Sequence, residues 1–71
     1  MSGLSPAASS SGTLEVYDLA GRLVRRMSGD ARIGFAWDTR DDGGLRVPPG
    51  VYLHRVRTAA GSWTGRSVVV R

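Results

Sequence analysis

The residues with the clearest potential for chemistry are three aspartates in one short segment, Asp38, Asp41 and Asp42, with Gly43 directly after them. Such a cluster could hold calcium, which takes about six to eight oxygen ligands. Looped calcium sites place acids at alternate positions and add a distant glutamate, and this segment has neither feature. Aspartate side chains also bond nearby backbone amides in tight turns. The pattern therefore favours a structural turn over a cation site.

His54 is the only histidine, and the chain has no cysteine. A histidine pair, a thiolate metal site, a disulfide and a thiol nucleophile are therefore excluded. A histidine base needs a nucleophile and an orienting group beside it, and no Gly-x-Ser-x-Gly turn supplies the nucleophile. His54 lies between Leu53 and Arg55, so we expect it on the surface of a strand. The sequence predicts no catalytic residue, no metal site and no cofactor.

Three aromatic residues, Trp37, Tyr52 and Trp63, could stack on sugar rings. Aromatic side chains at strand spacing more often pack in a core or at its rim. Trp63 stands beside a turn, which favours an exposed position and makes it the candidate surface contact. A carbohydrate-binding role therefore stays open, with Trp63 as the residue that would carry it.

All ten basic residues are arginines, and with six acidic residues they give a net charge of +4. This charge would attract polyanions weakly. Proteins that bind nucleic acid usually cluster basic groups on one face and interleave aromatic residues. Here the arginines are spread over nearly every expected element, and the absence of lysine, asparagine and glutamine is typical of a GC-rich coding bias. We expect no specific nucleic-acid binding.

The length allows one domain with a thin core, because a chain of this size buries only about 60% of its unfolded surface. No apolar run approaches the ~20 residues of a membrane span, so no membrane insertion is expected. Residues 1–12 are rich in serine, alanine and glycine, which predicts a flexible linker or the remnant of an upstream strand. This start lacks the basic and apolar blocks of a signal peptide.

The elements that position these side chains are predicted to be strands, because apolar and polar residues alternate and no helical spacing appears. Turn signals recur about every ten residues, at Gly21, at Ser28-Gly29-Asp30 and at Ala59–Ser62. The run Val68–Val70 predicts burial on both faces. This pattern is typical of a β-sandwich of five or six strands. The expected strands cover residues 13–18, 23–27, 32–37, 51–58 and 63–70, with a short extended piece at 45–47.

The segment Trp37–Val56 combines the acidic turn with Pro48-Pro49-Gly50. Proline fixes φ and removes a backbone donor, and glycine supplies a positive φ that other residues avoid. The residue before a proline is pushed towards extended geometry. The segment therefore predicts two antiparallel strands joined by a rigid, non-catalytic connection.

Four motifs in this order resemble those of one family. Val16–Arg25 resembles its V-Y-D-x-x-G-R-x-V opening, and Trp37–Gly44 resembles its W-D-G-x-D-x-x-G turn. Val47–Tyr52 resembles its V-x-x-G-x-Y element, and Arg66–Arg71 resembles its final strand. The family is the FlgD-type immunoglobulin-like domain of flagellar hook-capping proteins, which is similar to the C-terminal sorting domains of type IX secretion cargo. The residues that carry the resemblance are Tyr17, Asp18, Gly21, Arg22, Trp37, Asp38, Asp42, Gly43, Pro49, Gly50 and Tyr52.

The resemblance covers residues 13–71 and implies an all-β, immunoglobulin-like sandwich of about six antiparallel strands. It also implies a non-enzymatic, C-terminal accessory module of an exported bacterial protein, for secretion sorting, surface attachment or spacing. A flagellar hook-cap assembly scaffold stays open as an alternative, as does the carbohydrate-binding module. The implied partners are secretion or surface-assembly proteins and upstream domains of the parent protein. The implied location is extracellular or at the bacterial cell surface.

Two features depart from the family pattern. Thr39 stands where the family turn usually has glycine after Trp-Asp. The relatives also carry an additional strand upstream, of which Leu4-Ser5-Pro6 is the expected remnant. A missing first strand, from a truncated reading frame or an excised domain, would leave a sheet edge open. We therefore expect the isolated chain to be marginally stable or to self-associate through that edge.

Overall fold

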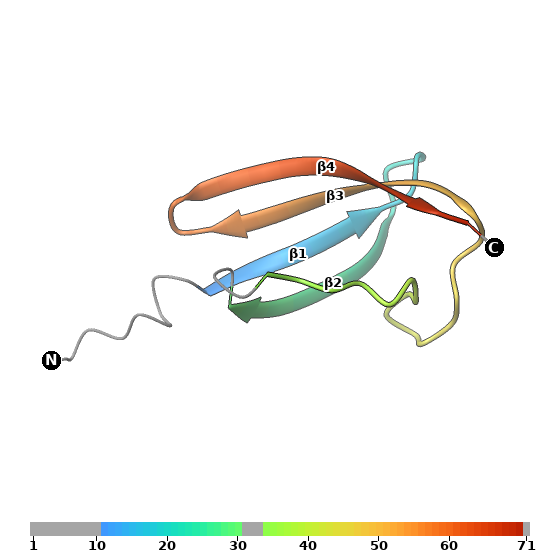
Figure 1. The fold of residues 1–71 in the computed structure, drawn as a ribbon, viewed down its shortest axis with the longest axis horizontal. Coiled ribbons are helices and arrows are strands. Elements are labelled where there is room, and N and C mark those ends of the chain that lie inside the picture. The colour runs from blue at the N-terminus through green and yellow to red at the C-terminus, as the bar shows by residue number, and fades with distance from the viewer. Residues whose placement is uncertain (1–10, 31–33, 71) are drawn as a thin grey trace, which may run out of the picture.

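The computed structural model describes residues 11–30 and 34–70. They form one antiparallel sheet with the strand order β2-β1-β3-β4, so β1 and β3 are central while β2 and β4 lie at the edges (Figure 1). The described ranges contain no helix that is long and apolar enough to cross a membrane. The predicted all-β class is confirmed. The strands are β1 (Ser11–Tyr17), β2 (Leu23–Asp30), β3 (Gly50–Thr58) and β4 (Gly61–Val69).

Both predicted hairpins, β1–β2 and β3–β4, are present, but the first is longer than the sequence indicated. The predicted turn at Ser28-Gly29-Asp30 is wrong, because β2 runs through it and pairs there with Ser11–Thr13. Pairing with a neighbouring strand overrides a weak local turn preference. Ser11 and Gly12, which composition placed in the linker, therefore belong to β1. The rest of the predicted linker, including Leu4-Ser5-Pro6, lies outside the described residues.

The segment 34–47 lies on one face of the sheet and adds no strand to it. A strand was predicted over residues 32–37, yet the described residues 34–37 pair with no strand, and 31–33 lie outside the described ranges. The predicted extended piece at 45–47 makes only an isolated bridge between Arg40 and Arg46. Alternation of apolar and polar residues indicates which side chains face a core. A strand also needs a neighbouring strand to bond its backbone, and alternation does not supply one. The described residues thus form four strands in one sheet, and a sandwich of about six strands is not seen among them.

The core lies between the sheet and this covering segment. Trp37 of the segment meets Tyr52 of β3 edge-on, with ring centroids 5.4 Å apart and an interplanar angle of 70°. This arrangement is favourable for aromatic pairs. Only one face of the sheet is covered by described residues in this way. The buried cluster comprises Leu14, Val16, Val47, Tyr52 and Val69, with Val24, Met27, Phe35, Trp37 and Val56 packed against it.

The predicted burial of Val68–Val70 on both faces is wrong. Val69 is buried, but Val68 and Val70 are 67% and 80% exposed. β4 is an edge strand of a sheet that has one covered face, so its side chains alternate between core and solvent. A run of valines therefore does not by itself identify a central strand.

Candidate functional site

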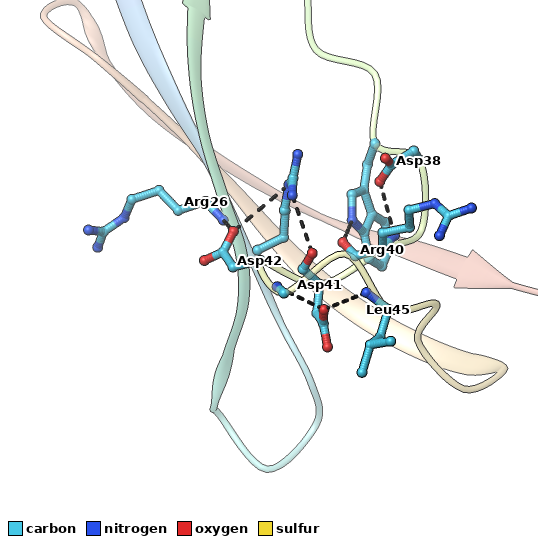
Figure 2. Close-up of polar contacts among 9 residues, drawn as sticks. Arg26, Asp38, Arg40, Asp41, Asp42 and Leu45 are labelled. Atoms are coloured by element: carbon cyan, nitrogen blue, oxygen red, sulfur yellow. Dashed lines mark hydrogen bonds and ion pairs between the residues drawn. The ribbon is translucent and has the colours of Figure 1, made fainter.

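The acidic segment forms a tight turn that its own carboxylates hold closed (Figure 2). Oδ1 of Asp41 accepts hydrogen bonds from the backbone amides of Gly43 and Leu45, both at 2.9 Å. The amide of Asp41 donates to the carbonyl of Leu45 at 2.8 Å. Oδ1 of Asp38 accepts from the amide of Arg40 at 3.0 Å. Both carboxylates thus satisfy backbone donors of the loop.

The third carboxylate of the segment anchors the turn to β2. Oδ1 of Asp42 accepts from the backbone amide of Arg26 at 3.1 Å, and the amide of Asp42 donates to the carbonyl of Val24 at 3.0 Å. The Arg25 side chain adds a bond from Nη1 to the Asp41 carbonyl at 3.3 Å. The three carboxylates therefore serve three separate sets of backbone amides. The described part of the chain contains no group of three or more His, Asp or Glu side chains placed to hold a metal ion.

Two aromatic side chains bond the backbone within the acidic turn and after it. Nε1 of Trp37 donates to the carbonyl of Arg40 at 2.9 Å, and the hydroxyl of Tyr52 donates to the carbonyl of Pro48 at 2.6 Å. Tyr52 is buried, whereas Trp63 on β4 is 57% exposed. The three aromatic residues considered as a sugar platform therefore do not share one exposed surface. Among the described aromatic residues, Trp63 is the one that presents a large exposed ring to solvent.

The β1–β2 turn is organised by Asp18. Its Oδ1 accepts from the backbone amides of Ala20 and Arg22 at 3.0 and 2.9 Å, and its Oδ2 accepts from Nε of Arg22 at 3.2 Å. Gly21 adopts φ 87°, which glycine tolerates without strain. The bond from the Arg22 amide, helped by the Arg22 guanidinium, lowers the pKa of Asp18 below its ordinary 3.8. The Asp18 carboxylate is thus occupied by its own turn.

The structure brings together His54 and Ser67, a pair that the sequence did not connect. Nδ1 of His54 lies 2.9 Å from Oγ of Ser67. The pairing of Tyr52 with Ser67 and of His54 with Gly65 makes them diagonal neighbours on β3 and β4. His54 is half-buried on the core face, two residues from Tyr52, and not on the open surface. The two-residue spacing between Tyr52 and His54 was the sequence signal for this placement, because alternate residues of a strand share a face.

Among the described residues, the His54–Ser67 pair has no third polar group of the kind that a hydrolytic site needs. It borders an open hollow of about 450 Å³, whose other lining residues include Phe35 and Trp37 and no acid. Nε2 of His54 lies against Gly65, so close that a side-chain carbon on that glycine would be 2.6 Å away. A serine–histidine mechanism needs a base oriented by a further polar group. The geometry supports a polar contact at the margin of the core.

Comparison with known protein families gives a match. A model of the FlgD Ig-like domain family matches residues 2–62, which is more than half of the chain. The matched range contains the Asp18 turn, the acidic turn and all of β3, and it ends at the second residue of β4. No curated protein and no solved structure matches.

Proposed function

The chain belongs to the FlgD Ig-like domain family, and on that premise we propose that it is a non-enzymatic assembly module of the flagellar hook-capping type. The family is one of structural, non-catalytic modules. The observation that carries the proposal is the family match over residues 2–62. The contacts of the family's motif residues agree with it, because Asp18, Asp38 and Asp42 all bond the backbone.

An immunoglobulin-like sandwich is the fold that this proposal assigns to the complete domain. The covering segment 34–47 supports it, since Phe35, Trp37 and Val47 pack on the covered face of the sheet as a second layer would. The hydrogen bonds from Trp37 and Tyr52 to backbone carbonyls hold that layer in place. A module built this way presents a fixed shape to other proteins, which is what a scaffold requires.

The family match favours hook-cap assembly over secretion sorting, since the matching model is that of the FlgD Ig-like domain. Type IX sorting, surface attachment and an extracellular location stay predictions that depend on the motif resemblance alone. A carbohydrate-binding role depends on Trp63, whose ring is 57% exposed. A single exposed ring supplies one stacking face, so this role is the weakest of the three.

A deletion in the bacterium that encodes the chain would test the proposal. The codons for residues 11–70 would be removed in frame, and hook assembly and export of the encoded protein would be measured separately. We expect hook assembly to fail while export continues. The matched control is Trp63→Ala, which removes the exposed ring and leaves the sheet intact.

Two results would overturn this assignment. Normal hooks combined with retention of the encoded protein inside the cell would identify a sorting module. Normal hooks, normal export and loss of polysaccharide binding in the Trp63→Ala variant would identify a carbohydrate-binding module.

A further inference from the structure

Arginines that are scattered along the sequence gather on the second face of the sheet, opposite the covered one. The strand register places Glu15 of β1 directly between Arg26 of β2 and Arg55 of β3. Arg57 is two residues further along β3, and Arg66 of β4 lies opposite Leu53. Alternate residues of a strand share a face, so these side chains all project from the same side.

Glu15 lies beneath two of these arginines and is only 3% exposed. Its Oε2 accepts from Nη2 of Arg26 at 3.2 Å, and its Oε1 lies 3.7 Å from Nη1 of Arg57. The two arginine side chains are 58% and 59% exposed, so they cover the carboxylate and still reach solvent. Each guanidinium carries five N–H donors, of which Glu15 engages few. The carboxylate therefore bonds Arg26, lies within ion-pair distance of Arg57 and leaves most donors of both guanidinium groups unengaged.

The other two arginines border a shallow hollow of about 620 Å³ on this face. Tyr17 and Leu53 contribute its apolar part, and Leu53 is 42% exposed. Within the described ranges, neither Arg55 nor Arg66 pairs with a carboxylate. An exposed apolar side chain with arginines beside it is the composition of a protein–protein interface.

We propose that this basic face, formed by Arg26, Arg55, Arg57 and Arg66 with Leu53 at one end of it, docks an acidic protein segment. Four arginines against one buried carboxylate leave three uncompensated positive charges, most of the net +4 of the chain. With neighbouring strands about 4.8 Å apart, the arginines span roughly 14 Å across the sheet. The partner therefore carries several carboxylates along an extended stretch, with an apolar side chain beside them for Leu53.

The geometry favours a protein over a nucleic acid as the occupant. Single-stranded nucleic acid binds where exposed aromatic rings lie between basic groups. Tyr17 on this face is half-buried, and the exposed Trp63 is paired with Val56, which places it on the opposite face. The apolar Leu53 beside Arg55 and Arg66 would contribute nothing to phosphate contacts. This inference concerns a surface that the hook-cap proposal does not use, and it stands or fails separately.

The test is a titration of the full chain with a short synthetic peptide of repeating Glu-Glu-Leu, followed by fluorescence anisotropy. Its controls are the same peptide with Gln for Glu and a single-stranded oligothymidine. We expect binding to the acidic peptide only, with affinity falling about tenfold in R55Q/R66Q, as expected when two exposed charge contacts to the peptide are lost. The matched variant R40Q/R46Q removes the same charge from the covering segment and should change affinity less than about twofold.

Three results would overturn the proposal: no binding by the unmodified chain, equal losses in the two double variants, or tighter binding of the oligothymidine. Thermal unfolding of each variant would show whether it folds. If R55Q/R66Q fails to fold, amide chemical shifts of the unmodified chain decide the question. Shifts at Leu53, Arg55 and Arg66 on adding the peptide support the proposal, and shifts confined to residues 38–47 refute it.

Discussion

The carboxylate of Asp42 accepts a hydrogen bond from the backbone amide of Arg26 at 3.1 Å, so a loop side chain is bound to the outer edge of β2. The amide of Asp42 also donates to the carbonyl of Val24 on the same strand. Edge strands present unpaired backbone groups that attract other strands. Asp42 therefore closes the acidic turn onto the sheet and covers part of one exposed edge.

Replacing Asp42 with alanine is expected to lower the free energy of unfolding by about 1 kcal/mol, the typical contribution of one hydrogen bond. Urea unfolding followed by tryptophan fluorescence would measure it. Asp42→Asn keeps an oxygen acceptor for the Arg26 amide and should retain most of the stability. Equal stability of the alanine variant and the unmodified chain would show that the contact contributes nothing.

Thr39 adopts φ 62°, a left-handed conformation in which its side chain is strained, at the position where the family turn has glycine. Thr39→Gly should relieve this strain, while added freedom of the unfolded chain offsets part of the gain. We expect a net stabilisation below about 1 kcal/mol, seen as a higher Tm. Thr64→Gly, in the middle of β4, is the control and should lower Tm. A lower Tm for Thr39→Gly would contradict the inference that the left-handed conformation of Thr39 is strained.

Gly65 leaves the space that the His54 ring occupies. A methyl group there would lie 2.6 Å from Nε2 and 2.9 Å from Cε1 of His54, well inside contact distance. Gly65→Ala should therefore displace the ring, break its contact with Ser67 and cost about 1–3 kcal/mol.

Urea unfolding and the His54 ring resonances would report the two effects of Gly65→Ala. The neighbouring Thr64→Ala, at an exposed position, is the control and should change neither measurement. Removing the ring as well, in G65A/H54A, should recover part of the stability relative to Gly65→Ala. If Gly65→Ala leaves the ring resonances unmoved, the close approach does not exist in solution.

Asp18 makes the β1–β2 hairpin sensitive to acid. Its backbone hydrogen bonds lower its pKa in the folded state below the ordinary 3.8. The stability it contributes is therefore present above pH 3.8 and is lost as pH falls through the lower folded-state pKa. Asp18→Asn should be less stable than the unmodified chain near neutral pH, and this difference should shrink below that pKa. Tm measured against pH would show whether the two curves converge, and parallel curves would contradict the prediction.

β4 lies at the edge of the sheet, and in the described ranges no strand pairs with its outer side. We propose that two copies associate through this edge at high concentration. Thr64→Lys would place like charges near each other across such an interface and should favour the monomer. Ser28→Lys on β2 adds the same charge elsewhere and should not. Sedimentation equilibrium would measure the association, and a chain that is monomeric at every concentration would refute it.

The sequence predicted the two hairpins and the positions of β1 and β3 to within two residues at each end. Alternation with a period of two and turn residues such as Gly21 are local signals. The structure that they predict depends on neighbouring residues and is kept in the folded chain. The strand expected at 32–37 was wrong in its described part, because Phe35 alternates with exposed neighbours without any strand beside it. The turn expected at Ser28-Gly29-Asp30 was wrong because β1 extends far enough to pair with it.

The amino-acid sequence by itself determined where the chain turns and which side chains of one strand share a face, because both depend on sterics between near neighbours. It also carried the motifs of the FlgD Ig-like domain family. Only the tertiary structure decided which strands are adjacent and in what register. That pairing sets His54 beside Ser67 and gathers arginines of three strands on the face that carries Glu15. Contacts between distant residues follow from cross-strand register and not from spacing along the chain.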